Sequence, residues 1–211
     1  MNRKGILFDL DGTLWDTFDI TFKSINKIVK KYNLDKVSKE TVIKSFGLNK
    51  FEISKLYFPN VELDKGLKYF DESENFNIEY LKNHGGIVYS GVSDVLIKLY
   101  EKYDLFIVSN ASSKKYIEAF LISSNLGKYF KDYIAASEIN ISKACAINKI
   151  INDYKLDWCL YIGDTLKDMK AAKLCNIPFI QARYGFGDVC KCDYYINSIN
   201  ELPYIIYKNF K

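Results

Sequence analysis

The stretch Leu7-Phe8-Asp9-Leu10-Asp11-Gly12-Thr13 joins a short apolar run to two carboxylates and a Gly-Thr turn. Ligands of open α/β sheets bind beyond the carboxyl ends of such buried strands. Asp9 and Asp11 are two residues apart, so an extended chain projects both to one side, where one carboxylate can attack or bind metal while the other handles protons. Gly12 lets the backbone leave the strand sharply, and free amides at the Gly12-Thr13 turn can meet a phosphate. The alternative is a polar turn that caps a strand.

Several other short runs, rich in β-branched and aromatic residues, also have the character of buried parallel strands. The expected strands are residues 5–9, 105–109, 133–136, 159–162 and 179–182, with a short edge strand at 194–196. The expected helices between them are residues 114–124, 144–154 and 165–175. This alternation predicts an α/β fold with a Rossmann-like, doubly wound parallel sheet.

About ninety residues between the first and second strands break the alternation. Apolar residues there recur at helical spacing, which predicts amphipathic helices. These are residues 17–32, 38–46, 50–57 and 71–83. A connection of this length is normally functional or a separate unit. We therefore expect an all-α helical bundle at residues 16–87, inserted into a core built from residues 1–15 and 88–211.

A second acidic motif follows the strand that ends at Ile162, in the run Gly163-Asp164-Thr165-Leu166-Lys167-Asp168. Asp164 is expected at the strand tip and Asp168 about one helical turn beyond it, so both can approach one cleft. Two hard oxygen donors beside a third carboxylate describe a magnesium site. Equally, Asp164 can be a helix N-cap and Asp168 a first-turn acid favoured by the helix dipole.

Two weaker signals accompany these motifs. Ser109 and Asn110 end the second predicted strand, where a hydroxyl and exposed amides can hold phosphoryl oxygens. Lys143 opens the helix after the third predicted strand, where a cation can neutralise charge on a transferring phosphoryl group. Taken singly, Ser109 is better explained as a turn cap and Lys143 as surface charge.

Taken together, Asp9-x-Asp11-Gly-Thr, Ser109, Lys143 and Gly163-Asp164-x-x-x-Asp168 resemble, in order and approximate spacing, the four motifs of the haloacid dehalogenase-like hydrolases. The likeness covers essentially the whole chain. The helical insertion resembles the small α-helical cap of the phosphoglycolate phosphatase and β-phosphoglucomutase-like branch.

The resemblance implies a role for each motif residue. Asp9 would attack phosphorus to form an aspartyl phosphate, and Asp11 would protonate the leaving oxygen and then activate water. Asp9, Asp164, Asp168 and the main-chain carbonyl of Asp11 would hold Mg²⁺, while Ser109 and Lys143 would steady the phosphoryl group. The dehalogenases of the superfamily lack the second acid, so Asp11 favours phosphate-ester chemistry.

Departures from the pattern leave two assignments open. Lys143 is followed by Ala144 where many relatives have proline, so the alternative motif cations are Lys114, Lys115 and Lys149. In the insertion, the run Phe46-Gly47-Leu48-Asn49-Lys50 resembles the cap turn that faces the active site, which implies substrate contacts from Gly47 and Asn49. The alternative is a plain helix connection, with Gly47 as C-cap and Asn49 as N-cap.

Composition supports a folded protein in a reducing compartment. The chain has 211 residues and a net charge of +4, with 30 basic residues that form no single block, so nucleic acid is not indicated. Its five cysteines are odd in number, and Cys190 and Cys192 have no second cysteine pair or histidine near them, which argues against both a disulfide framework and a zinc site. No run has membrane-spanning length, so we expect no membrane partner and a cytoplasmic location.

These observations predict a Mg²⁺-dependent phosphatase that hydrolyses a small phosphorylated metabolite, as a monomer or homodimer. A phosphomutase of the β-phosphoglucomutase type would share every core residue. A non-hydrolytic phospho-acceptor module, as in bacterial receiver domains, also uses clustered aspartates, a hydroxyl and a lysine, but it places its acceptor after a later strand and has no helical insertion.

Overall fold

The structure, a computed structural model, describes residues 3–187 and 191–210. Its centre is a six-stranded sheet in the order β5-β4-β1-β6-β7-β8, and every neighbouring pair is parallel. The strands are β1 (Lys4–Phe8), β4 (Asp104–Ser109), β5 (Phe130–Ala135), β6 (Trp158–Gly163), β7 (Phe179–Ala182) and β8 (Tyr195–Ile196). From β1 the chain adds β4 and β5 on one side of β1 and then β6, β7 and β8 on the other. The first strand therefore lies at a topological switch point, where open α/β sheets bind ligands.

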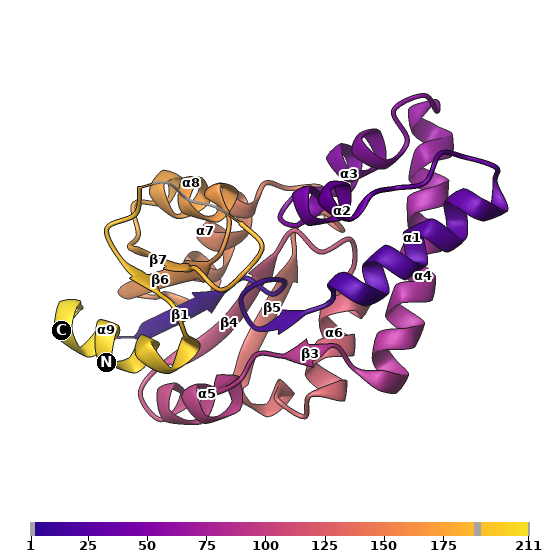
Figure 1. The fold of residues 1–211 in the computed structure, drawn as a ribbon. Helices are drawn as coiled ribbons and strands as arrows, with labels where there is room; N and C mark the ends of the chain where they lie inside the picture. Colours follow the sequence, from indigo (N-terminus) through magenta and orange to yellow (C-terminus); the bar gives the residue numbers. More distant parts are fainter. Residues whose placement is uncertain (1–2, 188–190, 211) are drawn as a thin grey trace.

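Helices cover both faces of this sheet (Figure 1). One face carries α7 (Lys143–Tyr154) and α8 (Leu166–Leu174), and the other carries α5 (Val92–Tyr100), α6 (Lys114–Ser123) and α9 (Leu202–Asn209). Two short 3₁₀ segments, Gly127–Tyr129 and Ile199–Glu201, complete the core. The predicted doubly wound α/β fold is confirmed.

Side chains of the central strands alternate between the two layers, as the period of two in a strand requires. In β1, Ile6 and Phe8 belong to the apolar cluster beneath α5 and α6, whereas Leu7 belongs to the cluster beneath α7 and α8. Leu7 and Phe8 are fully buried, which explains why this strand reads as an uninterrupted apolar run. The buried strand holds the following residue, Asp9, rigidly at the edge of the sheet.

The helical insertion has an apolar cluster of its own. It comprises α1 (Phe18–Lys31), α2 (Lys39–Ser45), α3 (Lys50–Tyr57) and α4 (Leu63–His84). Its buried members include Ile25, Val42 and Phe70, and it lies to one side of the sheet (Figure 1). We call this unit the cap. Before and after it, β2 (Trp15–Asp16) and β3 (Ile87–Val88) pair as an antiparallel ribbon. The predicted boundaries at residues 16 and 87 stay a prediction, and this ribbon supports them.

The expected elements match the observed ones to within a few residues. Helix α4, however, begins at Leu63 rather than at residue 71, and α5, α9, the short strands β2 and β3 and the two 3₁₀ segments were not predicted. Cys190 lies outside the described residues, and the other four cysteines are free thiols. Within the part of the chain that the structure describes, no helix combines the length and apolarity needed to cross a bilayer.

Candidate active site

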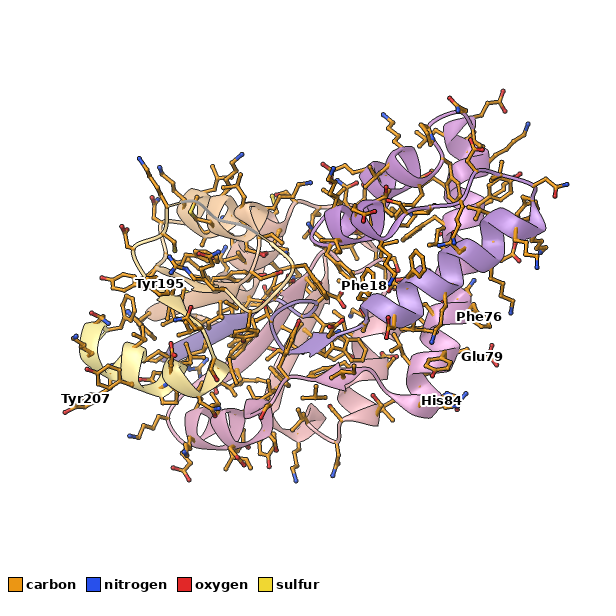
Figure 2. All side chains as sticks on the ribbon, in the orientation of Figure 1. Phe18, Phe76, Glu79, His84, Tyr195 and Tyr207 are labelled. Carbon is orange, nitrogen blue, oxygen red and sulfur yellow. The ribbon has the colours of Figure 1, made fainter. Side chains whose placement is uncertain are left out.

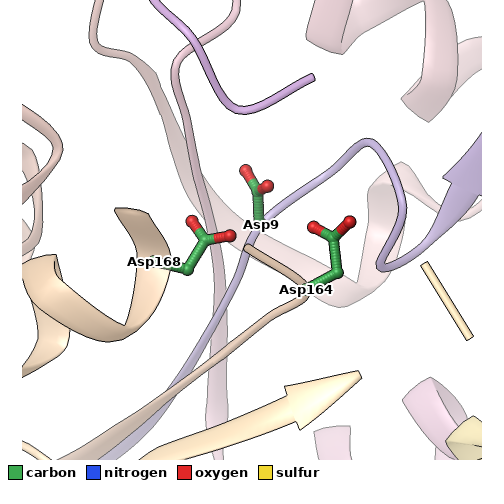
Figure 3. A group of neighbouring side chains, drawn as sticks. All are labelled: Asp9, Asp164 and Asp168. Atoms are coloured by element: carbon green, nitrogen blue, oxygen red, sulfur yellow. The ribbon is translucent and has the colours of Figure 1, made fainter. Parts of the chain in front are cut away.

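Three buried aspartates from two parts of the chain meet at the carboxyl edge of the sheet (Figure 3). Asp9 follows β1, Asp164 follows β6, and Asp168 lies in the first turn of α8. Each offers a carboxylate oxygen within 4.8 Å of the others. Strands β1 and β6 are hydrogen-bonded neighbours, so the two sequence motifs end side by side.

The surrounding backbone fixes two of these carboxylates. Asp168 Oδ2 accepts hydrogen bonds from the backbone amide and the hydroxyl of Thr165, at 2.9 and 2.6 Å, which makes a reciprocal cap at the start of α8. Asp164 Oδ2 accepts from the amides of Phe186 and Gly187, at 2.7 and 3.1 Å. Asp168 is therefore both the first-turn acid of α8 and a member of the acidic cluster, whereas the N-cap of this helix is Thr165, so the alternative prediction of Asp164 as N-cap is wrong.

Lys143 is the cation that the fold brings to the aspartates. Its Nζ lies 3.0 Å from Asp9 Oδ1 and donates to Asp168 Oδ1, and the residue is only 5% exposed. Lys143 reaches this position from the first residue of α7, whose N-cap Ser142 accepts from the amide of Cys145. Among the alternative lysines, Lys149 instead forms an exposed pair with Asp153. The structure thus places Lys143, the first choice from sequence, within the cluster.

Burial and mutual repulsion shape the charges at this site. Burial, followed by the charge of Asp168, raises the pKa of Asp9 to about 7 against the opposing effect of Lys143. Burial also raises the pKa of Asp164 well above its usual range. Burial alone would lower the pKa of Lys143, but Asp168 and Asp9 raise it above its ordinary value. An additional positive charge would therefore be bound favourably beside these acids.

The acidic cluster fits a hard divalent cation such as Mg²⁺. Three carboxylates at one place are the ligand type that Mg²⁺ prefers, and it usually uses only one or two of them with water. Asp164 Oδ1 is buried and has no hydrogen-bond partner among the described residues, so it is available as a ligand. Asp9, Asp164 and Asp168 are the side chains that would hold the ion, and the contribution of the main-chain carbonyl of Asp11 stays a prediction.

Asp11 lies next to this cluster but is held by different partners. Its Oδ1 accepts hydrogen bonds from the hydroxyls of Thr17 and Tyr116, both at 2.8 Å. Burial raises the pKa of Asp11 to about 6, and the hydrogen bond from Tyr116 works in the opposite direction. A carboxyl group with this pKa can both donate and accept a proton near neutral pH. Tyr116 was not singled out from the sequence, because nothing local marks a tyrosine in α6 as a partner of Asp11.

The Gly12-Thr13 turn is built differently from the expectation of free amides. The Gly12 amide donates to Trp15 O and the Thr13 amide donates to Leu10 O. Gly12 has φ +77°, and a Cβ on it would lie 2.2 Å from Asp164 Oδ2. Gly12 is therefore required for the approach of the two acidic motifs, and its assignment to phosphate binding stays a prediction, as does that of Thr13.

A cavity separates the core edge from the cap, and both contribute to its lining. Asp9, Asp11, Ser109 and Asn110 line it from the core. Ser109 Oγ accepts from the amide of Ala111, and Asn110 Nδ2 donates to the carbonyl of Gly47 in the cap, at 2.9 Å. The second predicted strand therefore delivers both of its polar residues to the cavity.

The two predicted cap residues have different positions. Gly47 lines the cavity and has φ +78°, and a Cβ there would lie 2.9 Å from a Thr165 methyl group. Asn49 does not line it, and instead caps α3 by accepting from the amides of Phe51 and Glu52. The structure thus gives Asn49 the helix-capping position that was its alternative explanation.

Two pairs of side chains join the cap to the core. Phe46 of the cap stacks on Phe186 of the core with ring centroids 3.9 Å apart. Lys167 of the core pairs with Glu52 of the cap. The sequence did not indicate either pair, since the partners lie more than a hundred residues apart.

An acidic cluster after the first strand, a lysine beside it and a helical insertion over it define an α/β enzyme that works at the carboxyl edge of a parallel sheet. The chain belongs to the family of haloacid dehalogenase-like hydrolases, whose model matches residues 6–182.

Individual relatives agree with this assignment. A phosphoglycolate phosphatase of Photobacterium profundum is 25% identical over 195 residues, which cover 87% of this chain and 85% of that protein. Pyrophosphatase PpaX of Listeria monocytogenes is 27% identical over 179 residues, 80% of this chain and 77% of its own. The crystal structure of a predicted phosphoglycolate phosphatase from Haemophilus somnus superposes with a TM-score of 0.85 at 21% identity, covering 97% of this chain and 98% of that one. This structure shows that the fold is shared.

Proposed function

We propose that the protein is a Mg²⁺-dependent phosphatase that hydrolyses a small phosphate monoester through an aspartyl phosphate on Asp9. The observation that carries the proposal is the meeting of Asp9, Asp164, Asp168 and Lys143 at one edge of the sheet, where Asp9 lines the same cavity as Asp11. Phosphoryl transfer requires positioning and compensation of spread negative charge, and these residues supply both. Family membership and phosphatase relatives support the same conclusion.

Each side chain has a defined task in this reaction. Asp9 is held by β1 as the nucleophile, with Lys143 Nζ 3.0 Å from its Oδ1. Bound Mg²⁺ would supply positive charge that lowers the repulsion between the phosphate and the attacking carboxylate. Asp11 gives a proton to the leaving oxygen and then takes one from the water that cleaves the acyl phosphate. Ser109 and Asn110, which line the cavity, would donate to the phosphoryl oxygens.

Phosphate release from a panel of several dozen small phosphate esters, measured with Mg²⁺ and with excess EDTA, tests this proposal. We expect turnover of p-nitrophenyl phosphate and of at least one metabolite ester, and loss of that turnover in EDTA that added Mg²⁺ restores. Sugar phosphates are also checked for isomerisation, because a phosphomutase would convert them without net phosphate release. Turnover that is unchanged by EDTA would reject the metal-dependent mechanism.

We also propose a cytoplasmic location and a small phosphorylated metabolite as the partner. The acidic site lies in a cavity bounded by both cap and core, which suits a ligand of metabolite size.

A further inference from the structure

The cap contributes a carboxylate to the cavity that the reaction does not use. Glu74 of α4 lines the cavity together with Asp9 and Asp11. Its Oε1 accepts a hydrogen bond of 2.6 Å from the hydroxyl of Ser112, which belongs to the core. The carboxylate is therefore fixed across the boundary between cap and core, and its charge reaches Asp11, whose pKa it raises in addition to the larger effect of burial.

A second side chain of α4 that lines the cavity is also a hydrogen-bond acceptor. Asn77, one turn further along α4, lines the cavity and is only 2% exposed. Its Nδ2 donates to Thr21 Oγ1 at 3.3 Å, while its Oδ1 is buried and has no hydrogen-bond partner in the described part of the chain. An unpaired buried carbonyl oxygen is unfavourable unless a ligand supplies a donor.

The charges of the residues that line the cavity disfavour a second anionic group on the substrate. Among the described residues that line the cavity, Lys50 is the one cation, whereas Asp9, Asp11 and Glu74 are acids. Burial raises the pKa of Glu74, which shows that a negative charge there is already costly. A carboxylate or phosphate on a leaving group that contacts these residues would be repelled by Glu74, whereas a hydroxyl or ammonium group would supply the hydrogen bond that Asn77 Oδ1 lacks.

We propose that Glu74, assisted by Asn77, determines specificity by selecting phosphate esters whose leaving group carries a hydrogen-bond donor, and by rejecting those with a second anionic group. This inference rests on the proposed phosphatase function and names its substrate class. The donor is a hydroxyl group, as in a polyol or sugar, or an ammonium group, as in an amino alcohol. Both present N–H or O–H groups to the same two acceptors.

The test compares kcat/KM of the wild type on five compounds with Mg²⁺ present. Glycerol 3-phosphate and phosphoethanolamine carry a hydroxyl and an ammonium donor, phosphoglycolate and pyrophosphate carry a second anionic group, and p-nitrophenyl phosphate carries neither. We expect at least one donor-bearing ester to exceed both anionic ones by about tenfold or more, since a site built to hydrogen-bond a substrate group discriminates strongly. The better of the two donor-bearing esters identifies the source of the donor.

Glu74→Gln keeps the size of the side chain and removes its charge. We expect this variant to lose about tenfold more kcat/KM on the preferred donor-bearing ester than on p-nitrophenyl phosphate, mainly through KM. It should also gain on phosphoglycolate relative to p-nitrophenyl phosphate. The matched control is Glu79→Gln, because Glu79 lies on the same helix and points away from the cavity (Figure 2), and it should leave all five values unchanged.

The outcomes separate this inference from the proposed function. If the wild type hydrolyses p-nitrophenyl phosphate but prefers phosphoglycolate or pyrophosphate, the specificity assignment is wrong and the phosphatase proposal stands. The same holds if Glu74→Gln changes all five substrates by one common factor, because that is the result of a merely structural role. A wild type inactive on every compound with Mg²⁺ would overturn the phosphatase proposal and, with it, the specificity assignment.

Discussion

The edge of the core and the face of the cap that covers it are both polar, and each keeps acceptors without a protein donor, but the groups that could complete them differ. In the core, each oxygen of Asp168 has a protein donor, from Thr165 or from Lys143, whereas Asp164 Oδ1, in the cluster that would hold a cation, has none among the described residues. In the cap, Glu74 has Ser112 as a donor, and Asn77 keeps an acceptor that has no partner among the described residues. The core would thus be completed by a metal ion that serves every substrate, whereas the cap would be completed by a donor on the individual substrate. Changes in the core should therefore alter turnover on every substrate, and changes in the cap should alter the choice among them.

The largest effect is expected from Asp9→Asn. The amide is a poor nucleophile, so turnover should fall by about four orders of magnitude or more on all substrates. Because burial and Asp168 already oppose ionisation of Asp9, the variant should be no less stable than the wild type in EDTA. Phosphate release and thermal unfolding measure the two quantities. The control is Asp19→Asn, which changes an exposed acid at the start of α1 and should leave turnover unchanged. Equal activity of the Asp9 variant and the wild type would refute the nucleophile assignment.

Lys143→Met tests the role of the lysine that pairs with the aspartates of the core. We expect kcat to fall by about a hundredfold on all substrates, because the positive charge beside the phosphoryl group is lost. The free energy of unfolding in EDTA should fall by about 3 kcal/mol, since the variant leaves Asp9 and Asp168 buried without their ion pair. Chemical denaturation measures it. Lys149→Met removes only an exposed pair with Asp153 and should stay within about 0.5 kcal/mol of wild type.

Tyr116→Phe tests a hydrogen bond to Asp11 in the cavity between core and cap. The ring packs against Trp15 at 5.6 Å and is retained, whereas the hydrogen bond to Asp11 is lost. Burial raises the pKa of Asp11 to about 6, and the hydrogen bond from Tyr116 lowers it. Loss of this hydrogen bond should raise the pKa of Asp11 and move the corresponding limb of the kcat–pH profile to higher pH. We expect kcat to fall about fivefold at neutral pH with little change in KM.

The matched control for this variant is Tyr133→Phe, which removes a hydroxyl that donates to Glu118 away from the site. An unshifted pH profile for Tyr116→Phe would show that this hydroxyl does not position Asp11.

The smallest effect concerns stability and belongs to the cap. Burial raises the pKa of Glu74 above its ordinary value of 4.5, so its contribution to stability is complete below about pH 4.5 and is lost as pH rises through the folded-state pKa. Glu74→Gln has no such loss. We therefore expect the variant to gain a few degrees in Tm relative to wild type between pH 5 and pH 8, while Glu79→Gln tracks the wild type. A difference in Tm that is constant with pH would contradict the raised pKa.

The core was largely predictable from sequence because its signals are short in range. Each strand is a buried run followed at once by its polar residue, so the sequence alone places Asp9 and Asp164 at strand tips along one edge of the sheet. Helix α5 was missed although Val92, Val95 and Leu99 are buried at helical spacing. That signal was present in the sequence, and the prediction did not use it.

The cap face could not be predicted in the same way. Helix α4 was expected to begin eight residues late, and the missed segment contains Gly66, a poor helix former. Gly66 is required by packing instead, since a Cβ on it would lie 2.6 Å from Ser54 Oγ of α3. The same helix carries Glu72, Glu74 and Glu79, and only the three-dimensional packing determines which of them enters the cavity.

The ribbon formed by β2 and β3 has a consequence for how such a protein can change. Trp15 pairs with Val88 and Asp16 with Ile87, so the chain leaves and re-enters the core at a single place. A different helical domain whose two ends lie equally close can be inserted at this ribbon without distorting the sheet. Recombination, in nature or in the laboratory, can thus replace the cap as a unit and leave the core intact.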